Sequence, residues 1–138
     1  MTNPSYRQVC SGITGHIEVL NIELNEPTPE LFEELIRFFF MFHDPTTLNR
    51  QGNDVGKQYG SVIFTNCDFQ ASIAKRVIAE LQGHIDNKSV KQYSDKKVVT
   101  LVADANEFYE AHAEHQDYLN KNPSGYCNHF FRFKKWPK

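Results

Sequence analysis

The 138-residue chain is long enough for one domain, which at this size buries about two thirds of the surface that its unfolded chain exposes. Its composition, 40% hydrophobic and 23% charged, is ordinary for a soluble globular protein. A net charge of -2 gives no reason to expect nucleic acid or a membrane as a partner, and the longest apolar run, Phe38–Phe42, is too short to span a bilayer. The sequence does not open with a basic segment followed by an apolar one, so we expect a cytoplasmic protein. We also expect a monomer.

The number of cysteines limits the redox chemistry that the chain can carry out. There are three, Cys10, Cys67 and Cys127, which is an odd number in a chain without a secretory signal. We therefore expect free or redox-active thiols rather than a structural disulfide framework. The alternative is that all three are inert, because free cysteine often serves as a small buried hydrophobic residue.

Residues 1–15 are polar and contain glycine, and they are typical of a loop that leads into a strand over His16–Leu24. In that strand Leu20 and Ile22 share one face with Glu18. A carboxyl group placed among apolar residues loses hydration, which raises its pKa unless a cation compensates.

A helix is predicted from Pro29 to Phe42, with Thr28 as its N-cap. Residue Asp44 precedes a proline and ends the helix, because that position avoids helical backbone angles. Six apolar residues recur at helical spacing and form the expected core face. They are Leu31, Phe32, Leu35, Ile36, Phe39 and Phe42.

The next segment, His43–Tyr59, is long, polar and without periodic structure, yet it joins an apolar helix to an apolar strand. Connections of this length in small domains are usually functional or disordered. Gly52 and Gly56 suit tight turns, while Asn53 and Asp54 can bond their own backbone or a ligand. We therefore expect an ordered functional loop.

The remaining elements alternate between strand and helix. The patterns predict a strand over 59–65, a helix with Asp68 as its N-cap and a stop at Gly83, a loop over 85–96, a strand over 97–103 and a helix over 105–121. This order indicates an α/β arrangement in which helices lie against a sheet.

Three blocks, Asn3–Val19, His43–Tyr59 and Asn122–Cys127, resemble peptide methionine sulfoxide reductase A and occur in the family's order over nearly the whole chain. The resemblance implies a two-layer, ferredoxin-like α/β (α+β) fold, with residues 1–138 as a single domain. Family members open with a strand, a helix and a Gly-Cys-Phe-Trp turn that carries the attacking thiolate. This sequence contains no such turn, so we expect a partial domain that lacks the opening strand and helix.

The resemblance also implies an activity, the thiol-dependent reduction of peptide methionine (S)-S-oxide to methionine in protein repair under oxidative stress. It assigns the proton donor to Glu18, the substrate oxygen to the hydroxyls of Tyr6 and Tyr59, a bracing role to Asp54 and the resolving thiol to Cys127. Thioredoxin or another dithiol is the implied reductant, with no cofactor and no metal. The residues alone also fit structural roles: a paired Glu, two core-edge Tyr and a turn Asp.

Two other functions remain open from the sequence. A paralogue without the nucleophile could bind oxidised methionine, or the chain could act in redox sensing through Cys10 and Cys127. The sequence departs from the family at Gly60, Leu101 and His112, where Arg, Glu and Glu are usual.

Two further features have weaker interpretations. His112 and His115 could bind metal with Glu114 or His129, but the spacing is not of a zinc type. The aromatic and basic tail, Phe130–Lys138, could suit RNA or a membrane surface, although its length favours a segment docked on the protein.

Overall fold

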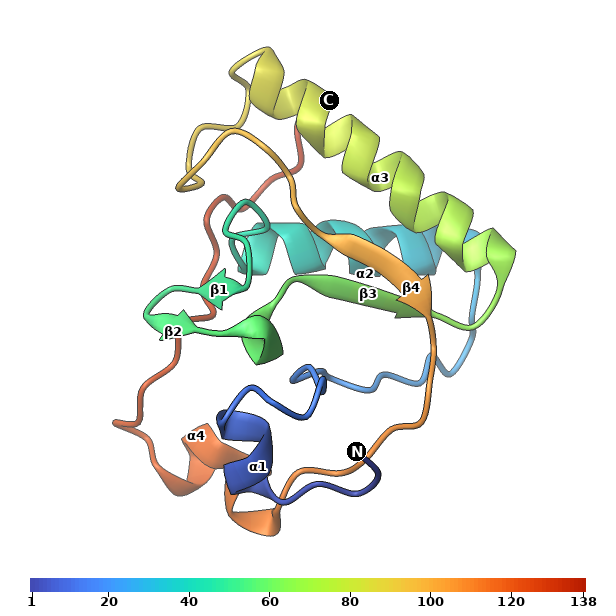
Figure 1. Ribbon diagram of the computed structural model, residues 1–138. Helices are drawn as coiled ribbons and strands as arrows, with labels where there is room; N and C mark the ends of the chain where they lie inside the picture. The colour runs from blue at the N-terminus through green and yellow to red at the C-terminus, as the bar shows by residue number, and fades with distance from the viewer.

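The computed structural model covers residues 1–138 and contains a parallel strand pair, a short antiparallel hairpin and two long helices (Figure 1). Strands β3 and β4 pair in parallel, with Ile63 opposite Val102. Helix α3 packs on both α2 and the β3–β4 pair, which confirms the predicted α/β class. The elements are α1 (Tyr6–Cys10), α2 (Pro29–Phe42), β1 (Arg50–Gln51), β2 (Asp54–Val55), η1 (Lys57–Tyr59), β3 (Val62–Thr65), α3 (Asp68–Asp86), β4 (Leu101–Asp104), η2 (Ala113–His115) and α4 (Tyr118–Lys121).

Helix α2 begins and ends as predicted. The Thr28 hydroxyl accepts a hydrogen bond from the Leu31 amide at 3.1 Å, which satisfies one free N–H of the first turn. The predicted core face is wrong in part, because Phe40 is completely buried whereas Leu31 is 39% exposed. The helix crosses α3 along the side that carries Ile36 and Phe40, so Leu31 lies outside the contact.

Helix α3 supplies most of the core. It runs past the predicted stop at Gly83 to Asp86, and its N-cap is Cys67 rather than Asp68. Phe69, in the first turn, is 59% exposed. The core residues of the whole chain are Ile36, Phe40, Ile63, Ile73, Ala74, Val77, Leu81, Ile85 and Val90. No helix is long and apolar enough to cross a membrane.

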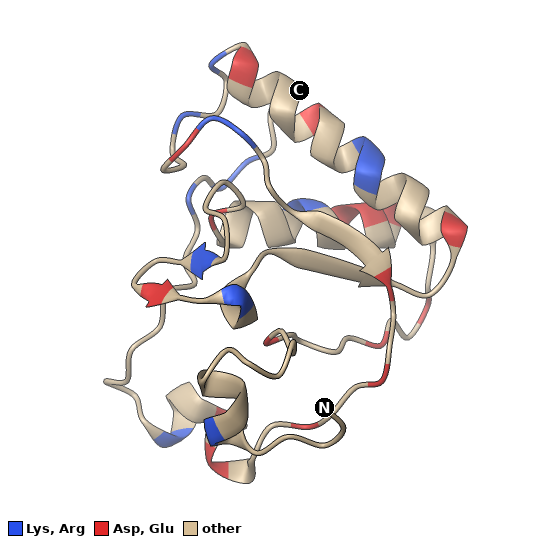
Figure 2. Cartoon of the chain, viewed as in Figure 1, with Lys and Arg blue, Asp and Glu red and all other residues tan.

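Acidic and basic residues are interspersed over both long helices (Figure 2). Arg37 of α2 pairs with Glu80 of α3 at 3.1 Å, and Arg76 of α3 pairs with Glu33 of α2 at 3.0 Å. These groups are partly exposed, so each pair contributes at most about 1 kcal/mol. Their main effect is to fix the register of the two helices.

A buried polar network joins the end of α2 to β3. The ring of His43 donates from Nδ1 to the Phe39 carbonyl at 2.5 Å, because a carbonyl can only accept. Its Nε2 then accepts from the Ser61 hydroxyl at 2.8 Å, and Ser61 in turn bonds to Thr100 at 2.7 Å. Burial lowers the pKa of His43 to about 4, so the ring is neutral at pH 7.

Two predicted elements are absent. Residues 16–24 form no strand, because a strand needs a ladder of partners and this segment makes one such bond, from the Glu18 amide to the Gln58 carbonyl at 2.9 Å. Residue Leu20 is accordingly 81% exposed. The helix predicted over 105–121 is reduced to η2 and α4, and Asp117 between them has a left-handed backbone (φ 54°) that interrupts helical geometry.

Two smaller corrections concern the chain near the candidate site. The strand predicted over 59–65 begins at Val62, because Tyr59 closes the 3₁₀ turn η1. Residues 1–15 were predicted to be loop, but they contain α1. The Ser5-x-x-Gln8 capping pattern in the sequence is the signal that could have identified this helix.

Candidate functional site

Tyr6 is the first residue of α1, and the helix cap fixes its backbone. Ser5 and Gln8 bond to one another reciprocally, with Ser5 N donating to Gln8 Oε1 at 2.7 Å. The Tyr6 ring stacks on His115, with 3.9 Å between ring centroids. A hydrogen bond with Cys10, followed by burial and nearby negative charge, raises the pKa of Tyr6 to about 12. The phenol is therefore protonated and able to donate at neutral pH.

Glu18 lies in the irregular segment between α1 and α2, where its amide bonds to the Gln58 carbonyl. Burial of the carboxyl by surrounding atoms raises the pKa of Glu18, and the negative charge of Asp54 raises it further. His115 acts in the opposite direction. The sequence-based expectation of a carboxyl group with a raised pKa is thus confirmed, although the residue is not in a strand and is exposed overall.

Gln58 joins the two segments that carry Tyr6 and Tyr59. It is buried, and its Nε2 donates to the Cys10 carbonyl at 3.1 Å. A Cβ atom at Gly56 would lie 2.2 Å from Gln58 Oε1, and Gly56 has a φ of +147°, so a side chain is excluded there twice over. Gly56 thereby permits the turn that places Tyr59.

Tyr59 faces the same groups from η1. Burial raises the pKa of Tyr59, and electrostatic interactions with Glu18, Cys10 and Asp54 contribute in the same direction. The two phenols and two carboxyl groups therefore interact electrostatically although they come from four separate segments. We call Tyr6, Glu18, Asp54 and Tyr59 the tyrosine–carboxylate cluster.

Asp54 is on the β1–β2 hairpin, close to the C-terminal segment. Its Oδ2 accepts a hydrogen bond from Asn128 Nδ2 at 2.7 Å, and the same amide nitrogen donates to the Gln51 carbonyl at 3.0 Å. The hairpin turns at Gly52 (φ +58°), where a Cβ atom would approach Asn128 to 3.2 Å. The hairpin and the C-terminal segment are therefore in direct contact.

All three cysteines are free. Cys127 is exposed, and its thiol lies 3.7 Å from the His129 carbonyl. It directly precedes Asn128, the residue that bonds to Asp54. Cys10 is the half-buried thiol that interacts with Tyr6. Cys67 is exposed at the start of α3, outside the cluster.

The cluster contains two phenolic hydroxyls that are protonated at neutral pH and a carboxyl group whose pKa is raised. No group of three or more His, Cys, Asp or Glu side chains is arranged to hold a metal ion. His112 and His115 instead lie against the Tyr6 ring. The arrangement thus suits acid-assisted chemistry on a polarised bond such as S=O.

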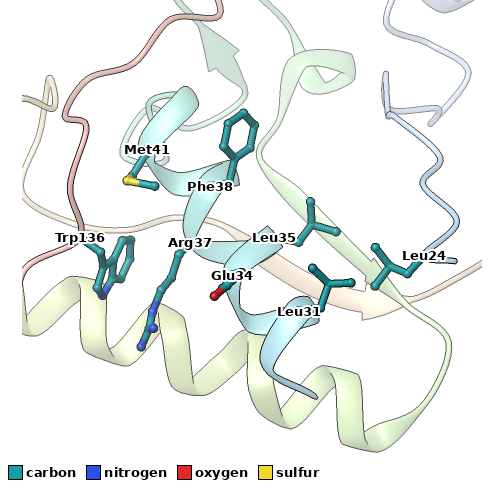
Figure 3. Close-up of a pocket in the computed structure, with 8 residues that line it drawn as sticks. All are labelled: Leu24, Leu31, Glu34, Leu35, Arg37, Phe38, Met41 and Trp136. Atoms are coloured by element: carbon teal, nitrogen blue, oxygen red, sulfur yellow. The ribbon is translucent and has the colours of Figure 1, made fainter. Parts of the chain in front are cut away.

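An open groove of about 510 Å³ lies elsewhere, along the outer side of α2 (Figure 3). Its lining is mainly apolar and contains no member of the tyrosine–carboxylate cluster. The lining residues are Leu24, Leu31, Glu34, Leu35, Arg37, Phe38, Met41 and Trp136.

Comparisons with known proteins agree with this chemistry. The model of the family described as peptide methionine sulfoxide reductase matches residues 1–136. A probable peptide methionine sulfoxide reductase of Schizosaccharomyces pombe is 46% identical over 133 residues, which are 95% of this chain and 74% of that protein. The peptide methionine sulfoxide reductase MsrA of Polynucleobacter asymbioticus is 47% identical over 126 residues, 91% of this chain and 62% of that protein.

Solved structures give the same result. Reduced Mxr1 from Saccharomyces cerevisiae has a TM-score of 0.80 at 37% identity, covering 94% of this chain and 67% of that one. Methionine sulfoxide reductase A of Corynebacterium diphtheriae has a TM-score of 0.77 at 34% identity, covering 92% and 61%. The chain belongs to the peptide methionine sulfoxide reductase family. It spans roughly two thirds of the length of these relatives, from 61% to 74%.

Three residues near the cluster were not assigned to it from the sequence. Gln58 carries no chemistry of its own and acts through buried hydrogen bonds. Asn128 follows Cys127 but is 74 residues from Asp54 in the chain. His115 was considered from the sequence as a possible metal ligand, and its contact with Tyr6 spans more than a hundred residues. No local pattern predicts contacts of this range.

Proposed function

We propose that this chain takes part in reducing peptide methionine (S)-S-oxide to methionine, as a peptide-methionine (S)-S-oxide reductase. One observation carries the proposal: Tyr6, Glu18 and Tyr59, from three separate segments, interact with one another, and the Glu18 pKa is raised. The names of the S. pombe and P. asymbioticus relatives support the substrate class.

The residues of the cluster have different roles in the reaction. Tyr6 and Tyr59 retain their phenolic protons at neutral pH, so both donate hydrogen bonds to the sulfoxide oxygen and polarise the S=O bond. Glu18, with its raised pKa, supplies a proton as the oxygen leaves sulfur. The charge of Asp54 helps to keep that pKa raised.

The reduction needs two thiols that react one after the other. A thiolate attacks the sulfoxide sulfur and takes over its oxygen, so the sulfoxide becomes a thioether and the thiol a sulfenic acid. The family resemblance implies that this thiolate belongs to a Gly-Cys-Phe-Trp turn. Cys127 then condenses with the sulfenic acid, which releases water and forms a disulfide. Thioredoxin or another dithiol reduces that disulfide.

This assignment also sets the context in which the chain would act. Its three thiols are free, and a dithiol-dependent cycle requires a reducing compartment, so we propose a cytoplasmic role in repairing proteins after oxidative stress. We further propose that residues 1–138 act as one domain.

Ligand titration by NMR tests the proposal directly. N-acetylmethionine S-sulfoxide should shift the resonances of Tyr6 and Tyr59, whereas N-acetylmethionine, which lacks the oxygen, should not. Tyr6→Phe removes one of the two hydroxyls and should weaken the response to the sulfoxide. Phe69→Leu changes an exposed residue outside the cluster and serves as its matched control. Spectra that are identical with and without millimolar sulfoxide would rule out substrate recognition by this cluster.

A further inference from the structure

The C-terminal segment Asn128–Trp136, here called the C-terminal strap, is attached to the body of the protein at several points. Arg132 is its central anchor: its amide donates to the Met41 carbonyl at 2.8 Å, and its Nη1 donates to the Phe42 carbonyl at 2.9 Å. Farther along, Trp136 Nε1 donates to Glu80 Oε1 at 2.7 Å. The strap therefore ties the end of α2 to the middle of α3.

The same arginine holds the start of the strap. Arg132 Nη2 donates to the Asn128 carbonyl at 3.1 Å and to Gln51 Oε1 at 3.3 Å. Gln51 is itself buried, and it bonds to the backbone of Asp44 through both ends of its amide, at 3.0 and 2.9 Å. Asn128 is thus fixed by a polar network that joins it to the buried residues Gln51 and Asp44.

The side chain of Asn128 faces two groups that can only accept, the Asp54 carboxylate and the Gln51 carbonyl. Its NH₂ group must point toward them, which leaves its own Oδ1 buried without a partner. A reversed amide would place its own acceptor oxygen against these two acceptors. The orientation is therefore set by the need to donate to Asp54.

We propose that Asn128 is a positioning residue that holds the Asp54 carboxylate beside Glu18. Arg132 in turn fixes Asn128 relative to the folded core. This inference rests on the proposed function, since it concerns how the proton donor of that reaction is kept in its working state. It also gives the C-terminal strap a role: it connects the chemistry of the site to the α2–α3 core.

Asn128 acts on Glu18 electrostatically, through the charge of Asp54. A carboxylate held in place exerts a steady negative charge on Glu18, whereas a released carboxylate moves into solvent, where its field is screened. The charge of Asp54 is one of the causes that raise the pKa of Glu18. Loss of the Asn128 bond should therefore lower that pKa.

Other titratable groups also face these two carboxyl groups and must be followed in the same experiment. Tyr6 and Tyr59 interact with Glu18, and His115 opposes the rise in its pKa. On the strap, His129 interacts with Asp54, and burial lowers the pKa of His129. Histidine ring signals are distinct from those of glutamate carboxyl groups, so each group can be followed separately.

The test is the titration of Glu18 in the complete 138-residue chain, measured by NMR of ¹³C-labelled glutamate without any ligand. Asn128→Leu keeps the shape of the side chain and removes its donors. The Glu18 midpoint should move to lower pH in this variant. Trp136→Phe removes a strap bond eight residues away and should leave the midpoint unchanged.

A double-mutant cycle tests whether Asn128 acts on Glu18 through Asp54. Asp54→Asn should lower the Glu18 midpoint by itself, and Asn128→Leu should add nothing in the Asp54→Asn background. If Asn128→Leu does not fold, Arg132→Lys, which weakens the contact with the Asn128 carbonyl, should shift the midpoint in the same direction. An unchanged midpoint in a folded variant, or an equal shift with and without Asp54, overturns the inference. Because no substrate is present, failure of sulfoxide binding is a separate result.

Discussion

The α2–α3–β3–β4 core and the segments that carry the candidate site are held together in different ways. Of the 18 buried residues, all except Thr14 lie between Ile36 and Val90. Tyr6, Glu18 and Cys127 lie in segments outside that range, and single hydrogen bonds and ring contacts hold them. The core depends on apolar burial and should unfold globally, whereas the site segments can open locally at lower cost. Three of the candidate site residues therefore lie in segments that should open at lower cost than the core.

The largest expected effect on the site segments, compared with the core, is on catalysis. The 138-residue chain alone should reduce N-acetylmethionine S-sulfoxide several orders of magnitude more slowly than a mixture with the opening segment of the S. pombe relative, because a covalent step without its nucleophile loses that much. Exposed residues such as Leu20 and Ile22 offer apolar surface for such a segment, and association should bury roughly 1,000 Å² or more. Dithiothreitol-driven turnover, followed by chromatography, measures the effect.

The control for this experiment is the same segment with its Cys replaced by Ser, which should bind without restoring turnover. Glu18→Gln should also abolish the gain. Turnover by the chain alone that disappears in Cys10→Ser would contradict the prediction, because it would identify Cys10 as the nucleophile. A segment that binds without activity would direct attention to Gly60, Leu101 and His112.

The core should respond most strongly to a cavity. Phe40→Ala removes a fully buried ring, and we expect it to lower the free energy of unfolding by about 3–5 kcal/mol. Phe69→Ala makes the same chemical change at a residue that is 59% exposed and should cost less than about 1 kcal/mol. Urea unfolding monitored by circular dichroism compares the two; equal losses would contradict the division into two regions.

The His43 network should make the stability of the core depend on pH between about 6.5 and 4. The pKa of His43 is about 4 in the folded chain and near 6.5 when unfolded, so the unfolded state binds more protons between these values. Stability should therefore fall as the pH drops from about 6.5 to 4, by up to about 3 kcal/mol. Thermal melts across this range should show the slope, and His43→Gln should flatten it. A wild-type slope that persists in the variant would exclude His43 as its cause.

The smallest effect concerns binding at the site. The protonated Glu18 carboxyl donates to a sulfoxide oxygen and the ionised form cannot, so affinity for N-acetylmethionine S-sulfoxide should fall as the pH rises through the Glu18 pKa. We expect a change of about 1 kcal/mol, or several-fold in Kd. In Glu18→Gln the amide donates at every pH, so its affinity should be flat. NMR titrations at three pH values would detect the difference, and parallel curves would count against this role.

The sequence by itself determined the elements whose signals are local. The Thr28-Pro29 start defined α2, helical spacing of apolar residues defined α3, and the glycines of the central loop marked real turns. It also determined the family, because that resemblance is spread over three blocks of residues. These features depend on neighbours within a few positions of each other.

The tertiary structure decided what depends on distant partners. Residues 16–24 have the pattern of a strand, but pairing requires another segment, and one hydrogen bond to Gln58 is all they receive. The choice of Phe40 over Leu31 for the core follows from where α3 lies, which helical spacing does not specify. Asn128 reaches Asp54 because the C-terminal strap folds back over the hairpin, and hydrogen bonds between residues 74 positions apart leave no periodic trace in a sequence.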